Sequence, residues 1–312
     1  MGSRGIRCSE PHPLIGGPVI AGILVSYEPE AQTLNGTFAS LLPQLDHLFL
    51  VDNGSSSDPA DLLDLKGEER LTIIRLDENL GIAAAQNAGI AAARELGAEF
   101  VVLSDQDTVY PKGAISSLLD VFERWPKAAA VVPLFNDVNK LSSDGFILEN
   151  SCLFSPTRVA GGEHSLLQAI ASGKVIKIST LGDIGAMDED LFIDWVDLEW
   201  CWRARHKGYQ VIGSGDVEVK HSLGDASRNI GYREVNLRSP LRHYYITRNA
   251  FSLALRTPYL SVVMRYILGV RSLRYPFAFP ILSPPRWRNL LAVTAGITDA
   301  LLGRLGKTDR TF

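Results

Sequence analysis

Short apolar runs recur along the first two thirds of the chain, and each of them ends in a polar stretch. The flanking residues are mostly Gly, Pro, Asn, Asp and Ser. Runs of this length with such boundaries are typical of strands buried in a sheet. We predict strands over residues 19–26, 48–51, 71–76, 100–103, 128–133, 210–213 and 217–219.

Helical spacing of apolar positions separates several of these runs. We predict helices over residues 29–42, 82–96, 112–125 and 197–206. The second of them is rich in alanine, which favours a helix that packs closely against its neighbours. Strands that alternate with helices indicate βαβ units. The predicted fold class is therefore α/β, with a mainly parallel, Rossmann-like central sheet flanked by helices.

The last quarter of the chain departs from this pattern. Residues 241–255 form a predicted helix with several arginines, and three apolar segments follow at 259–270, 277–282 and 290–302. All three are shorter than the ~20 residues that a helix needs to cross a bilayer. We therefore expect a lead-in over residues 1–17, an α/β domain over 18–237 and a helical extension over 238–312.

The charge is distributed unevenly, although the composition is that of an ordinary globular protein, 46% hydrophobic and 21% charged. Residues 238–312 carry 12 Lys and Arg and two acids, a net charge of +10, whereas the rest carries −14. An acidic body with a basic tail suggests an anionic partner. Because the tail is apolar, a membrane surface is favoured over nucleic acid. The alternative is that these helices pack on the body or on a second subunit, which would make an oligomer.

The cysteines and the N-terminus bear on the compartment. Cys8, Cys152 and Cys201 are odd in number and far apart, so neither a disulfide framework nor a metal-binding pair is predicted. Residues 1–17 lack the apolar core of a signal peptide. We expect a cytoplasmic protein, at the cytoplasmic face of the membrane if the tail docks there.

Two carboxylates, Asp105 and Asp107, follow the predicted strand at 100–103. Alternation in an extended segment would direct both to the same side. Ligands of open α/β sheets bind at the carboxyl ends of the strands. The pair is thus a candidate for a divalent metal and, through it, a diphosphate. The alternative is a solvated acidic turn.

Polar residues also follow the other predicted parallel strands, at Ser26-Tyr27, Asp52-Asn53 and Asn79 to Gly81. Asp52 could accept a hydrogen bond from a base or ribose, and Asn79 and Gly81 could let the backbone approach a phosphate. A simple turn at Asp52-Asn53 and a helix cap at Asn79 are the alternatives. Because such loops meet at one edge of a parallel sheet, together they predict a nucleotide site.

These motifs resemble those of the family 2 inverting glycosyltransferases with a GT-A fold, within them the bacterial rhamnosyltransferase-like group. The resemblance covers about residues 18–250 and rests on residues 26–27, 51–55, 79–83 with Asn87, and 104–107. The Asp-Gln-Asp form of the last motif is typical of that group. The resemblance implies a nucleotide-sugar site made of Ser26, Tyr27, Asp52, Asn53, Asn79, Gly81, Asn87, Ser104, Asp105 and Gln106.

A second acidic motif lies at residues 191–205. The resemblance places the general base that deprotonates the acceptor at Asp197, with Glu199 as a supporting carboxylate and Asp194 as the alternative base. The alternative is a structural role, in which these acidic residues stabilise the helix because they lie near its N-terminus. Ser172-Gly173 falls where the family has a small-residue turn near the acceptor. His221 resembles the family's late histidine, which would complete a shell for Mg²⁺ or Mn²⁺ with Asp105 and Asp107.

The expected activity is metal-dependent, inverting transfer of a sugar onto a hydroxyl of a cell-surface glycan or a lipid-linked oligosaccharide precursor. The donor indicated by the resemblance is dTDP-rhamnose, and glucosyl or galactofuranosyl transfer are alternatives. A sugar nucleotidyltransferase would carry a Gly-rich basic loop after the first strand, where this chain has Val25 to Pro29. A non-catalytic membrane scaffold would have lost an acidic motif, and both are intact.

Overall fold

A computed structural model describes most of the chain. The described residues are 17–63, 68–137, 145–151, 154–159, 161–221, 227–229, 234–236 and 239–312. The predicted lead-in therefore lies almost entirely outside the described residues, as do Cys8 and Cys152. Cys201 is buried with a free thiol.

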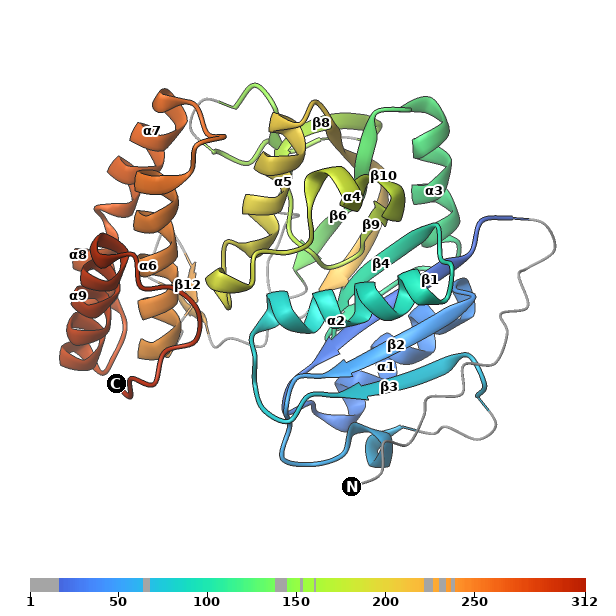
Figure 1. The fold of residues 1–312 in the computed structure, drawn as a ribbon, viewed down its shortest axis with the longest axis horizontal. Helices are drawn as coiled ribbons and strands as arrows, with labels where there is room; N and C mark the ends of the chain where they lie inside the picture. The colour runs from blue at the N-terminus through green and yellow to red at the C-terminus, as the bar shows by residue number, and fades with distance from the viewer. Residues whose placement is uncertain are drawn as a thin grey trace.

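Four parallel strands form one half of the central sheet, in the order β3-β2-β1-β4. They are β1 (Ile20–Ser26), β2 (His47–Asp52), β3 (Leu71–Arg75) and β4 (Phe100–Asp105). Their carboxyl ends point toward the C-terminal helices (Figure 1). This half agrees with the predicted elements to within two residues at most strand ends.

The other half of the sheet is mixed. Its main strands are β6 (Ala128–Asp137), β8 (Glu163–Gln168), β9 (Lys174–Lys177) and β10 (Gln210–His221), with the short β5 (Thr108–Val109) and β7 (Ile147–Leu148). The unpredicted β9 lies between β4 and β6 and is antiparallel to both. Strand β10 contains both of the predicted runs at 210–213 and 217–219 and is parallel to β6. A separate two-stranded sheet pairs β11 (Ser227–Asn229) with β12 (Glu234–Asn236).

Helices cover both faces of the sheet and bury its two apolar surfaces. The helices of this domain are α1 (Ala31–Leu41), α2 (Ile82–Glu95), α3 (Ala114–Arg124), α4 (Ile178–Ile184) and α5 (Val196–His206), with 3₁₀ turns η1 (Leu42–Gln44), η2 (Pro59–Leu62) and η3 (Glu189–Leu191). Successive residues of β1 enter opposite cores: Ile23 packs with α2 and α5, and Leu24 packs with α1 and α3. A Cβ at Gly89 would lie 2.4 Å from Ile23 Cγ2, so small residues allow α2 its close approach.

Four helices form the C-terminal part, namely α6 (Pro240–Arg256), α7 (Val262–Ser272), α8 (Tyr275–Leu282) and α9 (Arg286–Leu302). The α/β class with a helical extension is confirmed. Helix α6 lies between the sheet domain and α8–α9 (Figure 1). Ser239 caps α6 by accepting a hydrogen bond from Arg242 N, and Pro240 occupies its first turn. None of the helices in the described ranges combines the length and apolarity needed to cross a bilayer.

Candidate active site

A loop at residues 169–173 joins the two acidic motifs. It precedes β9 and reaches the end of β4, where Ser172 Oγ donates to Asp105 Oδ2. Gly173 N donates to Leu103 O at 2.7 Å, and the side chain of Ser172 is fully buried. One oxygen of the Asp105 carboxylate is thereby fixed in position.

The same loop holds Asp197, which lies in the first turn of α5. Ala171 N donates to Asp197 Oδ2 at 3.1 Å, while the buried Oδ1 has no hydrogen-bond partner among the described residues. Burial raises the pKa of Asp197 to about 6; the Lys174 ammonium opposes this shift, and the Asp105 carboxylate adds to it. A carboxylate with this pKa can accept a proton near neutral pH.

Lys174, which the sequence analysis missed, is a fully buried cation beside Asp197. Its Nζ lies 3.2 Å from Ala169 O and 3.4 Å from Asp197 O, and 5.6 Å from the centre of the Trp200 ring. A buried ammonium is costly unless carbonyls and a nearby carboxylate compensate it. The sequence offered one sign of this residue, a lysine directly before the apolar pair Val175-Ile176. No strand was predicted there.

The predicted metal ligands lie around the β4–β5 turn. Strand β4 ends at Asp105 and Asp107 is in the turn, so the alternation expected of an extended strand does not reach Asp107. Strand β5 pairs with β10, which places the backbone of His221 opposite Thr108. The side chain of His221 lies outside the described part of the structure.

The residues present fit a hard divalent cation. Asp105 and Asp107 offer carboxylate oxygens and are half-buried at the sheet edge. In the described ranges no three His, Cys, Asp or Glu side chains come together as a metal cluster. Mg²⁺ in phosphate-binding sites commonly takes one or two carboxylates and completes its shell with phosphates and water. Asp105 and Asp107 would supply the carboxylates of that pattern.

Two asparagines tie together the loops that follow β2 and β3. Asn53 Nδ2 donates to Asn79 Oδ1 at 3.2 Å, and Asn53 Oδ1 accepts from Leu80 N at 2.9 Å. Asn79 Oδ1 also accepts from Gly81 N at 3.0 Å. Both amides therefore shape the edge of the predicted nucleotide site.

Asp52 is fully buried and is engaged within the protein. Its Oδ2 lies 3.2 Å from Arg75 Nε, and its Oδ1 accepts from Ser55 Oγ. Ser55 Oγ in turn accepts from Glu28 N at 2.9 Å, which joins the loops after β1 and β2. The sequence analysis did not include Arg75 or Glu28 in the site. Their partners Asp52 and Ser55 are more than 20 residues away in the sequence.

The remaining predicted donor-site residues lie at the ends of β1 and β4. Ser26 is fully buried, whereas Tyr27 is exposed and its backbone N donates to Gln106 Oε1 at 2.9 Å. Ser104 Oγ accepts from the Tyr110 hydroxyl at 2.9 Å. The exposed Tyr27 ring is thus free to meet a ligand, while Gln106 links the two strand ends.

Two predicted site residues lie apart from the Asp105–Asp197 centre. Glu199 is buried and accepts two hydrogen bonds from Arg203, each 2.9 Å, and one from the Tyr259 hydroxyl. Asn87 holds Met187 through both backbone groups, at 2.9 and 3.0 Å. The structure gives both residues bracing contacts and does not bring either to the centre.

The loop that leads into α5 has an unusual backbone and is held by α6. Phe192, Asp194 and Trp195 all have positive φ, of 63°, 60° and 70°. Such conformations cost about 1–3 kcal/mol each and need support from outside the loop. Asn249 Nδ2 supplies it by donating to Leu191 O at 2.8 Å and to Ile193 O at 2.9 Å.

Asp194, the alternative base, is paired with α6. Arg242 Nε lies 3.2 Å from Asp194 Oδ2. The contacts of Asp197, by contrast, come from the loop that also binds Asp105. The structure therefore places Asp197 on the loop that also binds Asp105, and Asp194 against α6.

Gly81 brings the loop after β3 against the same strained loop. Ile82 N donates to Phe192 O at 2.8 Å, and Gly81 has φ +92° and ψ 161°, a region that only glycine adopts readily. A Cβ at position 81 would lie 2.5 Å from Phe192 O. Only glycine permits this contact between the loop after β3, which was predicted to bind the nucleotide, and the loop that leads into α5.

Gly81→Ala is expected to destabilise the fold by about 1–3 kcal/mol, because both φ and the backbone contact oppose a Cβ. Thermal or urea unfolding measures the loss. Gly97→Ala is the matched control, since Gly97 has φ +82° but nothing within 4 Å of its added Cβ. Equal losses in the two variants would mean that the Phe192 contact contributes nothing.

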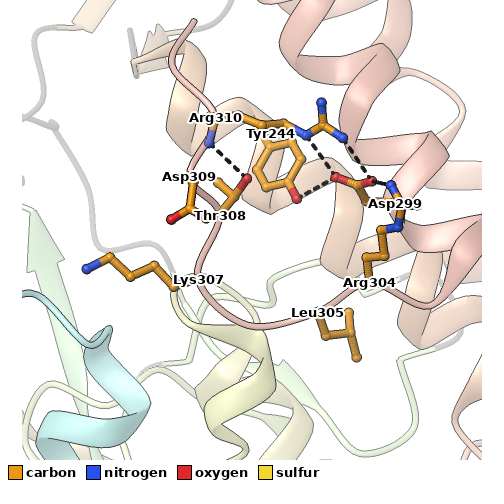
Figure 2. Close-up of a pocket in the computed structure, with 8 residues that line it drawn as sticks. All are labelled: Tyr244, Asp299, Arg304, Leu305, Lys307, Thr308, Asp309 and Arg310. Carbon is orange, nitrogen blue, oxygen red and sulfur yellow. Dashed lines mark hydrogen bonds and ion pairs between the residues drawn. The ribbon is translucent and has the colours of Figure 1, made fainter.

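The C-terminal residues fold back over the strained loop. Gly306 N donates to Asp190 O at 2.6 Å, and Lys307 pairs with Glu78 next to Asn79. Figure 2 shows the hollow that this tail forms with α6 and α9, where Asp299 binds the Tyr244 hydroxyl at 2.9 Å and Arg310 Nε at 3.2 Å. Asp299 thereby anchors the tail, and the hollow is separate from the Asp105–Asp197 centre.

Comparison with known sequences places this chain among sugar transferases. The family model described as "Glycosyl transferase family 2" matches residues 23–152. The chain is 32% identical over 238 residues to the "dTDP-rhamnosyl transferase RfbF" of Shigella flexneri, across 75% of this chain and 79% of that protein. It is 25% identical over 241 residues to an "N-acetylglucosaminyl-diphospho-decaprenol L-rhamnosyltransferase" of Mycobacterium tuberculosis, across 65% and 75% of the two chains.

Solved structures share the fold at low sequence identity. Residues 1–349 of S. aureus TarS, in complex with UDP-GlcNAc, match with a TM-score of 0.61 and 14% identity, over 92% of this chain and 81% of that one. The mannosyltransferase PcManGT of Pyrobaculum calidifontis, with GDP-Man and Mn²⁺, matches with a TM-score of 0.54 and 17% identity, over 91% and 75%. These similarities confirm the predicted GT-A fold.

Proposed function

The chain belongs to glycosyltransferase family 2, and we propose that it transfers L-rhamnose from dTDP-rhamnose to a hydroxyl of a cell-surface glycan or a lipid-linked oligosaccharide precursor. The names of the two similar rhamnosyltransferases support this donor, and the decaprenol-linked substrate in one of them supports a lipid-linked acceptor. The chemistry is proposed to be a single displacement with inversion at C1.

The observation that carries this proposal is the placement of Asp197 beside Asp105. Asp197 Oδ2 is held by Ala171 N, which leaves Oδ1 to take the proton of the acceptor hydroxyl. The acceptor oxygen then bonds to C1 of the sugar as the bond from C1 to the diphosphate oxygen breaks. Nucleoside diphosphate leaves from the opposite face, and no covalent enzyme intermediate is required.

The donor is proposed to bind at the carboxyl ends of β1–β4, with Tyr27 at the exposed side of the nucleoside site. Asp105 and Asp107 would hold Mg²⁺ or Mn²⁺, in agreement with the Mn²⁺ of PcManGT. When bound, the cation supplies positive charge that offsets the developing charge of the leaving diphosphate. Ser172 orients Asp105 for this role through its hydrogen bond.

A panel of nucleotide sugars tests the proposal. Release of nucleoside diphosphate is measured with dTDP-rhamnose, UDP-glucose and UDP-galactofuranose, each with Mg²⁺, with Mn²⁺ and with a chelator. We expect the greatest release with dTDP-rhamnose and loss of release with the chelator. Preference for another donor would overturn the rhamnosyl assignment, and full release with the chelator would overturn the role of the metal.

Lys174→Met is expected to move the acidic limb of the kcat/KM pH profile to higher pH. The Lys174 ammonium favours the ionised carboxylate and so lowers the pKa of Asp197, which burial raises. Removing the charge leaves that pKa higher still, so the base becomes protonated at a higher pH. The measurement is the pH profile of sugar transfer in the variant and in the wild-type enzyme.

Lys177→Met is the matched control, because Lys177 ends the same strand and is exposed. It should leave the acidic limb where it is. Lower activity of Lys174→Met with an unmoved acidic limb would show that Lys174 acts through packing alone.

A further inference from the structure

Helices α7, α8 and α9 expose an unusual number of large apolar side chains. Val262 is 80% exposed, Phe277 is 68% exposed and Ile281 is 63% exposed. The other exposed members of this set are Val263, Tyr266, Val270, Leu273, Trp287, Leu290, Leu291, Leu301 and Leu302. We call these twelve side chains the apolar face. Large apolar side chains left exposed in this number on three consecutive helices favour a binding surface over ordinary solvent exposure.

Helix α8 is the plainest case. Its eight residues, Tyr275–Leu282, contain no charged side chain, and none of the eight is buried. A hollow on α8 is lined by Arg274, Phe277, Ala278, Ile281 and Leu282. Six of its residues are half-buried, and the rings of Phe279 and His243 stack, so α8 is packed on the protein but leaves Phe277 and Ile281 exposed. These two apolar side chains would gain free energy from burial against a partner.

The charge around the apolar face has one sign. Residues 239–298 contain eight arginines and no lysine, aspartate or glutamate. Of the eight, Arg248 is buried and Arg242 is paired with Asp194 within the protein. Arg274, Arg286 and Arg288 are exposed and flank Phe277 and Trp287. A partner that complements the apolar face therefore offers negative charge to the arginines at its surface and apolar groups below that surface.

A second copy of this chain fits these charges poorly. In a two-fold symmetric dimer the same patch meets itself, so arginines would face arginines without an intervening acid. Anionic lipid head groups supply the missing negative charge, and the acyl boundary accepts the apolar side chains. Trp287 and Tyr266 belong to the residue types that prefer the membrane–water interface.

We propose that the apolar face docks this enzyme on an anionic lipid surface, with α7, α8 and α9 lying in the interface. The helices have 11, 8 and 17 residues, short of the ~20 that span a bilayer, so they lie on the membrane. This inference goes beyond the proposed sugar transfer and does not depend on the donor.

The docked helices are connected to the catalytic loop through α6. Helix α6 packs against α7 and α9 on one side, and its Asn249 holds residues 191–193 on the other. The carboxyl ends of β1–β4 also point toward these helices (Figure 1). The helices that carry the apolar face and the carboxyl ends of β1–β4 thus lie on the same side of the sheet, with α6 between them (Figure 1).

Co-sedimentation of the full chain with vesicles tests the proposal. The vesicles contain either phosphatidylcholine alone or phosphatidylcholine with phosphatidylglycerol, and neither donor nor acceptor is present. We expect binding to the anionic vesicles at low salt, release at high salt, and little binding to the neutral vesicles. Failure to bind anionic vesicles at low salt would overturn the proposal and leave the proposed sugar transfer untouched.

Two pairs of variants distinguish binding through the arginines beside the apolar face from binding through positive charge anywhere on the protein. Arg274→Gln with Arg288→Gln should weaken vesicle binding about 25-fold, since each arginine contributes about fivefold, or about 1 kcal/mol. Arg94→Gln with Lys127→Gln removes the same charge from exposed positions of the α/β domain and should leave binding unchanged. Equal effects of the two pairs would overturn a specific docking face.

Phe277→Ser with Ile281→Ser tests the apolar contribution, and both side chains are exposed enough for the fold to tolerate the change. We expect at least a tenfold loss of vesicle binding with an unchanged unfolding temperature. If these substitutions leave vesicle binding intact but convert a dimer into a monomer by sedimentation, the apolar face is a subunit interface and the lipid proposal is wrong.

Discussion

Asp107→Asn is expected to lower sugar transfer by more than about 10²-fold while leaving the fold intact. The substitution keeps the shape of the side chain and removes the negative charge that would hold the cation at the leaving diphosphate. Losing one electrostatic contact to charge that develops in a transition state commonly costs about 10²–10³ in rate. Asp107→Ala should fail similarly. Initial rates with saturating Mn²⁺ measure the effect.

Asp107 lies in a turn at the end of β4, so its replacement should alter thermal unfolding little. Asp120→Asn is a suitable control, because Asp120 is an exposed carboxylate on α3. Isothermal titration of the donor should show weaker binding for Asp107→Asn in the presence of Mn²⁺. Near-normal turnover in either Asp107 variant would show that the Asp-Gln-Asp motif holds no catalytic metal.

Asp197→Asn is expected to reduce kcat by about 10²–10⁴, the range for loss of general-base help, with donor affinity nearly unchanged. Asp194→Asn should cost less, because Asp194 is paired with Arg242 rather than placed beside Asp105. Steady-state kinetics with varied donor and acceptor give the ranking. If the Asp194 variant proved the more damaged of the two, the base would have to be moved to that position.

The same base predicts the pH dependence of the wild-type enzyme. Burial raises the pKa of Asp197 to about 6, and the base works only when it is deprotonated. Transfer should therefore fall as the pH drops below about 6 and level off above it. The residual activity of Asp197→Asn should lack this acidic limb, which the pH profile of kcat/KM would show.

Local patterns in the sequence determined much of this protein. The apolar runs that became β1, β2, β3 and β4 alternate with helices, and this spacing was enough to predict an α/β sheet with Asp105 and Asp107 at its edge. The motif at 191–205 placed Asp197 in the first turn of α5. These predictions succeeded because side-chain period and turn chemistry act over a few residues.

Only the tertiary structure decided how these local pieces combine. The four-residue β9 carries too little pattern to be predicted, yet it enters between β4 and β6 because strand pairing joins residues far apart in sequence. Its preceding loop brings Ser172 to Asp105 and Ala171 to Asp197. The burial of Lys174, which helps to set the pKa of the base, likewise arises from packing around it. The positive φ values at 192–195 persist because Asn249, more than 50 residues later, holds the loop. Burial and long-range hydrogen bonds are properties of the assembled chain, so no local pattern encodes them.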